Sequence, residues 1–273
     1  MRSREDETLA RAAVTALTRQ LELAPKPGLP DPRDLDARVT RQDHCAHRWS
    51  AKALAPGLAA MAAAARRTGA ATPELRAELG AIGRSTEHSV ALAGGGHRGA
   101  TWVLGLLVAA AALEPGARGR ELATTAKKIA AQPDRRAPRR PSRGSSVSAT
   151  YGAAGARGEA RAGFPHIRRA LDALSRARSA GAPEPQARLD ALLTVMSTLQ
   201  DTELLYTAGP HGLRHVQAGA RTVLDAGGTS TAAGREALAA LDADLHARAW
   251  SPRGSASLLA GALFADSLPV VPR

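Results

Sequence analysis

The 273-residue chain has few cysteines, few aromatic residues and no long apolar run. Cys45 is the only cysteine, so no disulfide can form within the chain and nothing requires an oxidising compartment. The longest apolar run, residues 99–113, is shorter than the roughly 20 residues that cross a bilayer, and we interpret it as a buried core helix. The first residues carry charges of both signs and do not resemble a secretory signal. We therefore expect a cytoplasmic protein that does not contact a membrane.

Strand-forming residues are also scarce. Aromatic residues make up 3% of the chain, and valine and isoleucine are few beside alanine and leucine. Alanine and leucine favour helices, and a chain of this length can bury a sizeable core. The composition therefore predicts an all-α protein, with residues 1–273 forming a single many-helix globular domain that carries its functional loops at the helix ends.

The apolar spacing places the expected helices. Thr72 is expected to cap the helix that starts at Pro73, Gly181 to end another, and Ser255 to cap the last one. The expected helices, apart from the one that starts at Pro73, span residues 5–23, 49–67, 99–113, 163–180, 183–206, 212–226, 231–249 and 255–268.

Positive charge is concentrated in one part of the sequence. The net charge is +12, and between Arg118 and Arg143 nine lysines and arginines accompany only Glu121 and Asp134. About residues 132–148, which overlap the second half of this region, the sequence is rich in proline, arginine and serine, which predicts a flexible basic loop. No aromatic residues lie between its cations to stack on bases, so we favour a solvated loop over a nucleic-acid arm. An anionic small-molecule ligand would also suit the positive field.

The stretch "GGGHRGA", residues 94–100, is a candidate phosphate site. Gly95 and Gly96 allow a close backbone approach, and the helix that follows offers free N–H groups. His97 and Arg98 would add hydrogen bonds and charge. The spacing matches neither a Walker loop nor a dinucleotide-binding loop, so a flexible turn is the alternative reading.

Three carboxylates are candidates for chemistry. Glu159 lies between Arg157 and Arg161 in "GARGEARAGFP", where it forms either a surface ion pair or part of a site. Glu203 continues an apolar stripe of the helix expected over 183–206, and Asp201 lies just beside it. A carboxylate on a buried stripe is costly unless it is paired or metal-bound, so both acids indicate function unless the helix end frays.

Five stretches, taken in their order along the chain, indicate a family more specifically than any one of them does alone. Together they resemble the triphosphoribosyl-dephospho-coenzyme A synthase family, which makes the prosthetic-group precursor of malonate decarboxylase and citrate lyase. The resemblance runs from about Leu9 to Leu268, and "GARGEARAGFP" is its most specific part. The five stretches are "KPGLPD", "TEHSVALAGGGHRGATWVLGLL", "YGAAGARGEARAGFPHI", "LQDTELLYTAGPHGLRHVQ" and "SPRGSASLLA".

The resemblance implies an all-α transferase that uses ATP and 3'-dephospho-CoA and releases adenine. Such a substitution passes through a cationic sugar, which calls for nearby negative charge, a base and cations for the triphosphate. On this basis Glu159 and Asp201 are expected to be catalytic. Mg²⁺ is expected as cofactor, bound through Glu87, Glu159, Asp201 and Glu203. The phosphates are expected to contact Lys26, Gly95, Gly96, His97, Arg98 and Arg157.

The sequence also departs from the family pattern. The loop before His97 is about three residues shorter and lacks an Asn-Thr pair, and an "H-x-D-M-D" segment is reduced to Asp43. Glu203 replaces an amide, Thr207 an arginine and Ser257 an acid. A catalytically weakened relative that binds a nucleotide or a protein is therefore the second reading. For an active enzyme we prefer the malonate decarboxylase pathway over citrate lyase. Its product would pass to a prosthetic-group transferase and an acyl-carrier subunit, and a homo-oligomer is left open.

Overall fold

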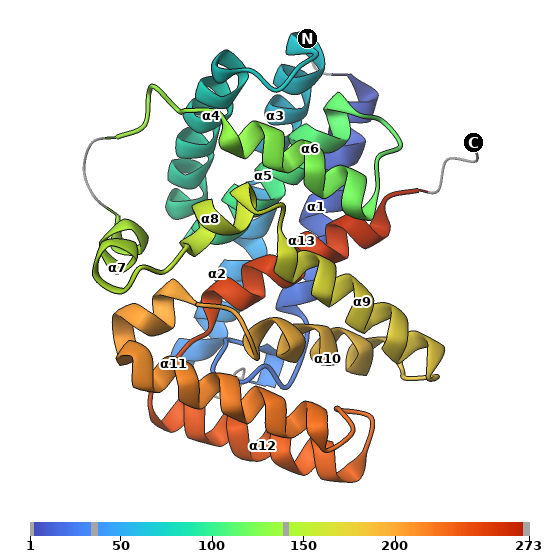
Figure 1. Cartoon of the computed structure of the whole chain (residues 1–273), viewed down its shortest axis with the longest axis vertical. Coiled ribbons are helices and arrows are strands. Elements are labelled where there is room, and N and C mark those ends of the chain that lie inside the picture. The colour runs from blue at the N-terminus through green and yellow to red at the C-terminus, as the bar shows by residue number, and fades with distance from the viewer. Residues whose placement is uncertain (1–2, 34–37, 139–141, 270–273) are drawn as a thin grey trace.

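A computed structural model describes residues 3–33, 38–138 and 142–269, with the backbone alone at 38–44. Every regular element in these ranges is a helix (Figure 1), which confirms the all-α class. The helices are α1 (Arg4–Leu21), α2 (Arg38–Lys52), α3 (Ala55–Thr68), α4 (Pro73–Leu92), α5 (Arg98–Leu113), α6 (Gly119–Ala131), α7 (Arg143–Tyr151), α8 (Gly155–Arg161), α9 (Pro165–Ser179), α10 (Glu184–Met196), α11 (Thr202–Asp225), α12 (Ala232–Ala247) and α13 (Arg253–Ser267).

Helix α5 forms the centre of the core. It is buried almost all round from Ala100 to Ala112, as a helix that is apolar on every face must be. It packs against α1, α3, α4, α6 and α13, while α9 to α12 form the other end of the molecule (Figure 1). Within the described ranges no helix has the length and apolarity to cross a membrane. The expectation of a buried core helix over 99–113 is thus confirmed.

Two glycines allow the central helices to approach closely. A Cβ atom at Gly105 of α5 would lie 2.6 Å from Sδ of Met61 on α3. A Cβ atom at Gly261 of α13 would lie 2.6 Å from a methyl carbon of Val103 and 2.7 Å from one of Ile167. Because neither gap can hold a methyl group, these glycines set how near α5 lies to its neighbours.

The predicted helix ends are confirmed in two cases and wrong in one. The Thr72 hydroxyl accepts a hydrogen bond from the Leu75 N–H at the start of α4. Gly181 follows α9 with a φ of 78°, the left-handed conformation that glycine favours. Ser255 does not cap α13, because that helix already begins at Arg253.

Two predicted helices are each divided. The helix expected over 49–67 is split between Lys52 and Ala55, where α2 ends and α3 begins. The helix expected over 183–206 stops at Met196, and α11 starts at Thr202. Glu203 therefore does not share a stripe with Met196, contrary to the sequence prediction. The break places the carboxylate of Asp201 at the start of a new helix.

The basic segment is more ordered than its composition predicts. Helix α6 precedes it and buries Leu122 and Ile129 on its apolar face. Helix α7 begins at Arg143, where Ser142 forms a capping box, so residues 143–148 of the expected loop are helical, and residues 139–141 lie outside the described part of the chain. Capping and apolar periodicity outweigh the local charge in these two helices.

Candidate functional site

The first turns of α5, α11 and α13 meet in the middle of the molecule. A Cβ atom at Gly99 of α5 would lie 2.5 Å from Oγ of Ser257 on α13. The N–H of Ser255 on α13 donates to Oδ2 of Asp201, the N-cap of α11, at 3.1 Å. Helix starts carry partial positive charge and free N–H groups. Their convergence therefore creates a region that attracts anions.

Helix α8 closes this arrangement on one side. The indole Nε1 of Trp102 on α5 donates to the backbone oxygen of Ala156 at 3.2 Å. A Cβ atom at Gly155 would lie 3.4 Å from Cγ2 of Thr202 at the start of α11. The first residues of the "GARGEARAGFP" motif thus form a short helix beside the site.

Asp201 joins two of the helix starts. It is 2% exposed, and its carboxylate accepts backbone N–H groups of Glu203 on α11 and of Ser255 on α13. Burial raises the pKa of Asp201 to about 6, although these backbone hydrogen bonds act in the opposite direction. A carboxylate of this kind holds α11 and α13 together and is ionised at neutral pH.

The raised pKa of Asp201 predicts a pH-dependent stability. Between pH 3.8 and about 6 the folded chain holds one proton more than the unfolded chain. The free energy of unfolding therefore falls as pH rises through this window, by about 2–3 kcal/mol from this group. Urea denaturation of the wild type and of Asp201→Asn should show the fall in the wild type alone. Parallel curves for the two proteins would contradict this prediction.

His97 is buried and fixed by the end of α2. Its Nε2 donates to the backbone oxygen of His47 at 2.8 Å and lies 3.1 Å from Oγ of Ser50. Burial lowers the pKa of His97 below its usual value, so the ring is neutral at pH 7. With its proton on Nε2, His97 presents a lone pair at Nδ1 instead of the positive charge expected from sequence.

Lys26 holds the end of α1. The side chain is 1% exposed, and Nζ donates to the backbone oxygens of Gln20 and Leu21 at 3.1 Å each. These carbonyls belong to the last turn of α1, where a cation is favoured. Asp31 accepts the Lys26 N–H at 2.9 Å and stabilises the "KPGLPD" turn. The ammonium thus has a structural role whether or not it also meets a phosphate.

One small cavity unites three motifs of the sequence. Its walls come from the end of α1, the "KPGLPD" turn, α2 and the starts of α5 and α13. Lys26, Gly96 and His97, all expected to be phosphate contacts, line it together with Arg253. Gly95 instead packs against the side chain of Ser50. The fold thus places Lys26, Gly96 and His97, which come from two motifs that are distant in sequence, around the same cavity.

Glu159 is directed to the start of α9. One carboxylate oxygen accepts the His166 N–H and the other lies beside His166 Nδ1, both at 2.8 Å. Between these residues Phe164 has a φ of 51°, a strained conformation for a residue with a side chain. Because α9 has no side-chain cap of its own, Glu159 supplies one and secures the turn.

Glu87 and Glu203 are the more accessible candidates. Glu87, near the end of α4, lies 3.6 Å from Nε of Arg98 at the start of α5, and its side chain is 33% exposed. Burial raises the pKa of Glu87 above its ordinary value. Glu203 lies 3.9 Å from Arg143, whose guanidinium is stacked on the Tyr206 ring. Arg98 and Arg157 are both exposed.

The four predicted metal ligands do not form a metal centre. Across residues 3–33, 45–138 and 142–269 no group of three or more His, Cys, Asp or Glu side chains lies close enough to hold an ion. Glu159 is paired with His166, and Asp201 accepts backbone N–H groups. The side chains present therefore do not fit a Mg²⁺ ion that is held by the protein alone. Asp43 lies outside the described side chains.

Chelator treatment tests this reading. Because the predicted ligands are held by protein groups, we expect excess EDTA to leave the melting temperature of the ligand-free protein unchanged within about 1 °C. Differential scanning fluorimetry with and without added MgCl₂ provides the measurement. A marked drop with EDTA, restored by Mg²⁺, would reveal a structural metal.

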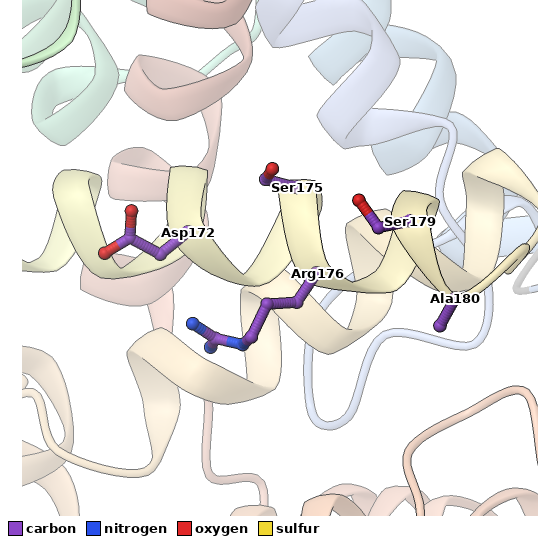
Figure 2. A pocket seen from close by; sticks show the side chains of 5 residues that line it. All are labelled: Asp172, Ser175, Arg176, Ser179 and Ala180. Carbon is purple, nitrogen blue, oxygen red and sulfur yellow. The ribbon is translucent and has the colours of Figure 1, made fainter.

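A second hollow lies along α9, away from the helix starts. Asp172, Ser175, Arg176, Ser179 and Ala180 line it, as Figure 2 shows. Four of them belong to α9 and Ala180 directly follows it, so a ligand would contact one wall only. Ligand sites usually enclose most of the ligand, and this hollow is not a candidate.

Three residues of the site region were missed from sequence. Arg253 belongs to the quoted "SPRGSASLLA" stretch and could have been named as a cation beside a helix start. Ser50 lies in no motif, and only the fold brings it to His97. His166 follows "GFP", and its pairing with Glu159 depends on the turn at Phe164. No spacing rule predicts the last two contacts.

The fold and site define a class: an all-helical protein whose helix starts and basic side chains surround an anion-sized site. Comparison with known families identifies it further. The model of the ATP:dephospho-CoA triphosphoribosyl transferase (CitG) family matches residues 6–272. The chain belongs to this family of transferases. No solved structure matched the chain.

Curated relatives agree with this assignment. A protein of Stutzerimonas stutzeri (strain A1501) is 46% identical over 267 residues, which cover 96% of this chain and 92% of the relative. A Pseudomonas fluorescens (strain Pf-5) protein is 47% identical over 96% of this chain and 91% of its own length. An Azotobacter vinelandii (strain DJ) protein is 46% identical with the same coverage. All three are named probable 2-(5''-triphosphoribosyl)-3'-dephosphocoenzyme-A synthase.

Proposed function

We propose that the chain transfers the triphosphoribosyl group of ATP to the ribose 2'-hydroxyl of 3'-dephospho-CoA. The oxygen of that hydroxyl forms a bond to C1 of the ATP ribose while the bond from this carbon to adenine breaks. Adenine leaves with the bonding electrons and takes up a proton, and the hydroxyl proton passes to a base. The product is 2'-(5''-triphosphoribosyl)-3'-dephospho-CoA. The family match over residues 6–272 is the single observation that carries this proposal.

The chemistry needs a base that can touch the substrate, and Glu87 meets this requirement best. Its side chain is 33% exposed, whereas Asp201 and Glu159 are buried and held by protein groups. A carboxylate of raised pKa is a better proton acceptor near neutral pH than an ordinary one. Its negative charge would also stabilise the cationic sugar. Glu159 and Asp201 then act as positioning residues.

The phosphates need cations and N–H donors around the same point. Arg98 pairs with Glu87 and begins α5, and Arg253 lines the cavity beside it. The starts of α5 and α13 add partial positive charge. Neutral His97 would accept a hydrogen bond from a sugar hydroxyl instead of pairing with a phosphate. This arrangement supports binding of both anionic substrates near Glu87.

The proposal also extends to the enzyme system that uses the product. We infer that the product serves malonate decarboxylase in the cytoplasm, through a prosthetic-group transferase and an acyl-carrier subunit. Magnesium would arrive with ATP as its chelate. A citrate lyase role is the alternative. Both systems use the same product, so deletion of the gene in the source organism distinguishes them: we expect the malonate decarboxylase carrier to lose its prosthetic group, whereas loss from a citrate lyase carrier would support the alternative.

Adenine release tests the reaction. The protein incubated with ATP, Mg²⁺ and dephospho-CoA should release adenine, and omission of dephospho-CoA should abolish the release. Coenzyme A, whose extra 3'-phosphate lies beside the attacking hydroxyl, provides a matched control substrate and should react poorly. Absence of adenine with the complete mixture would favour a catalytically weakened relative.

A further inference from the structure

Two arginines of α4 share one face with a glycine between them. Arg76, Gly80 and Arg84 follow each other at four-residue intervals, so they lie along one side of the helix. Oδ2 of Asp134 lies 3.6 Å from Arg76 and 3.1 Å from Arg84. A Cβ atom at Gly80 would overlap this carboxylate. The glycine therefore lets one acid reach between two guanidinium groups.

Two arginines of α8 face the same place. Arg157 and Arg161 are four residues apart and exposed, on one side of that helix. Both lie near enough to Arg76 for their charges to lower its pKa, with burial as the larger cause. Among the described residues Arg157 has no hydrogen-bond or ion-pair partner. We call Arg76, Arg84, Arg157 and Arg161 the arginine strip.

The arginine strip carries more positive charge than its surroundings neutralise. The single carboxylate of Asp134 lies beside both Arg76 and Arg84. Glu87, further along α4, is paired with Arg98. Arg76 is almost fully buried, and its guanidinium lies 4.8 Å from the centre of the Trp102 ring. Trp102, on α5, donates a hydrogen bond to the backbone oxygen of Ala156 on α8, which fixes α5 and α8 relative to each other. Rigidly held guanidinium groups whose positive charge is not neutralised by nearby carboxylates are typical of sites that bind phosphates.

We propose that the arginine strip binds the polyphosphate of a substrate, either the triphosphate of ATP or the diphosphate of dephospho-CoA. This inference rests on the proposed function and deepens it. Glu87 lies one turn of α4 beyond Arg84, so a phosphate chain on the strip would place the attached sugar at Glu87. None of the four strip arginines lines the cavity that contains Lys26 and Arg253, so this cavity remains for the second substrate.

Isothermal titration with inorganic triphosphate tests the strip without catalysis. Arg157→Ala removes one exposed guanidinium and should weaken binding about 10-fold, and Arg157→Glu should weaken it further. Arg235→Ala on α12 removes the same charge from a distant exposed arginine and should leave binding unchanged. Equal affinity of Arg157→Glu and Arg235→Ala would overturn the proposal. Unchanged melting temperatures ensure that folded proteins are compared.

Steady-state kinetics of the same variants identify the source of the phosphates. A higher KM for ATP alone assigns the triphosphate to the strip, and a higher KM for dephospho-CoA alone assigns the diphosphate. Weakened triphosphate binding with both KM values unchanged would overturn the substrate assignment. If the wild type releases no adenine, the proposed function fails, whereas the titration still decides whether the strip binds polyphosphate.

Discussion

Glu87→Gln is expected to lower kcat for adenine release by on the order of 100-fold or more. Glutamine keeps the size of the side chain and can still accept a hydrogen bond from Arg98, which lies 3.6 Å from Glu87. It cannot take up the proton of the attacking hydroxyl, and it offers no charge to a cationic sugar. The stability of the protein should change little because the side chain is partly exposed.

A matched change on the same helix controls for charge. Glu78→Gln removes an exposed carboxylate that pairs with Arg67, and it should leave kcat unchanged. The wild-type rate should also fall at acid pH as Glu87 takes up a proton, at a pH above the ordinary glutamate range. A Glu87→Gln enzyme with normal kcat would transfer the role of base to another group, with the Nδ1 of His97 as the next candidate.

Lys26→Met should lower the free energy of unfolding by about 2–4 kcal/mol. Methionine matches the length and volume of the buried lysine, so packing is retained. The backbone oxygens of Gln20 and Leu21, however, lose their ammonium donor at the end of α1. Urea denaturation followed by circular dichroism gives the measurement.

Lys128→Met is the control for this substitution. Lys128 is exposed on α6 and lies 3.8 Å from Glu114, a surface pair worth about 0–1 kcal/mol. The loss for Lys26→Met should clearly exceed that for Lys128→Met. Equal stabilities, with a raised KM for ATP in Lys26→Met alone, would make Lys26 a ligand group instead of a support for α1.

The helical class could be predicted from sequence because the composition and apolar spacing leave few alternatives. The 99–113 core helix and the Thr72 cap follow from local patterns alone. Two divided helices were not predicted, because the apolar spacing continues across the breaks at residues 53–54 and 197–201, although Pro56 and Asp201 are helix-start signals there. Helix α13 begins at Arg253, two residues before Ser255, and its N-cap Pro252 provides no side-chain hydrogen bond.

The site was predictable only in part. Motif order named Lys26 and His97, and the fold places both in one cavity. The partners of these side chains depend on tertiary packing, so the neutral ring of His97 could not be inferred from spacing. Glu159 stands between two arginines in sequence, yet its carboxylate reaches His166 seven residues later.

Analysis of the reaction products by mass spectrometry tests the central claim most directly. We predict that each adenine released from ATP accompanies one molecule of dephospho-CoA that has gained a triphosphoribosyl group. The wild type should form the two in a ratio of one to one, and Glu87→Gln should slow both equally. Release of adenine without the adduct, or transfer of phosphate alone, would contradict the account.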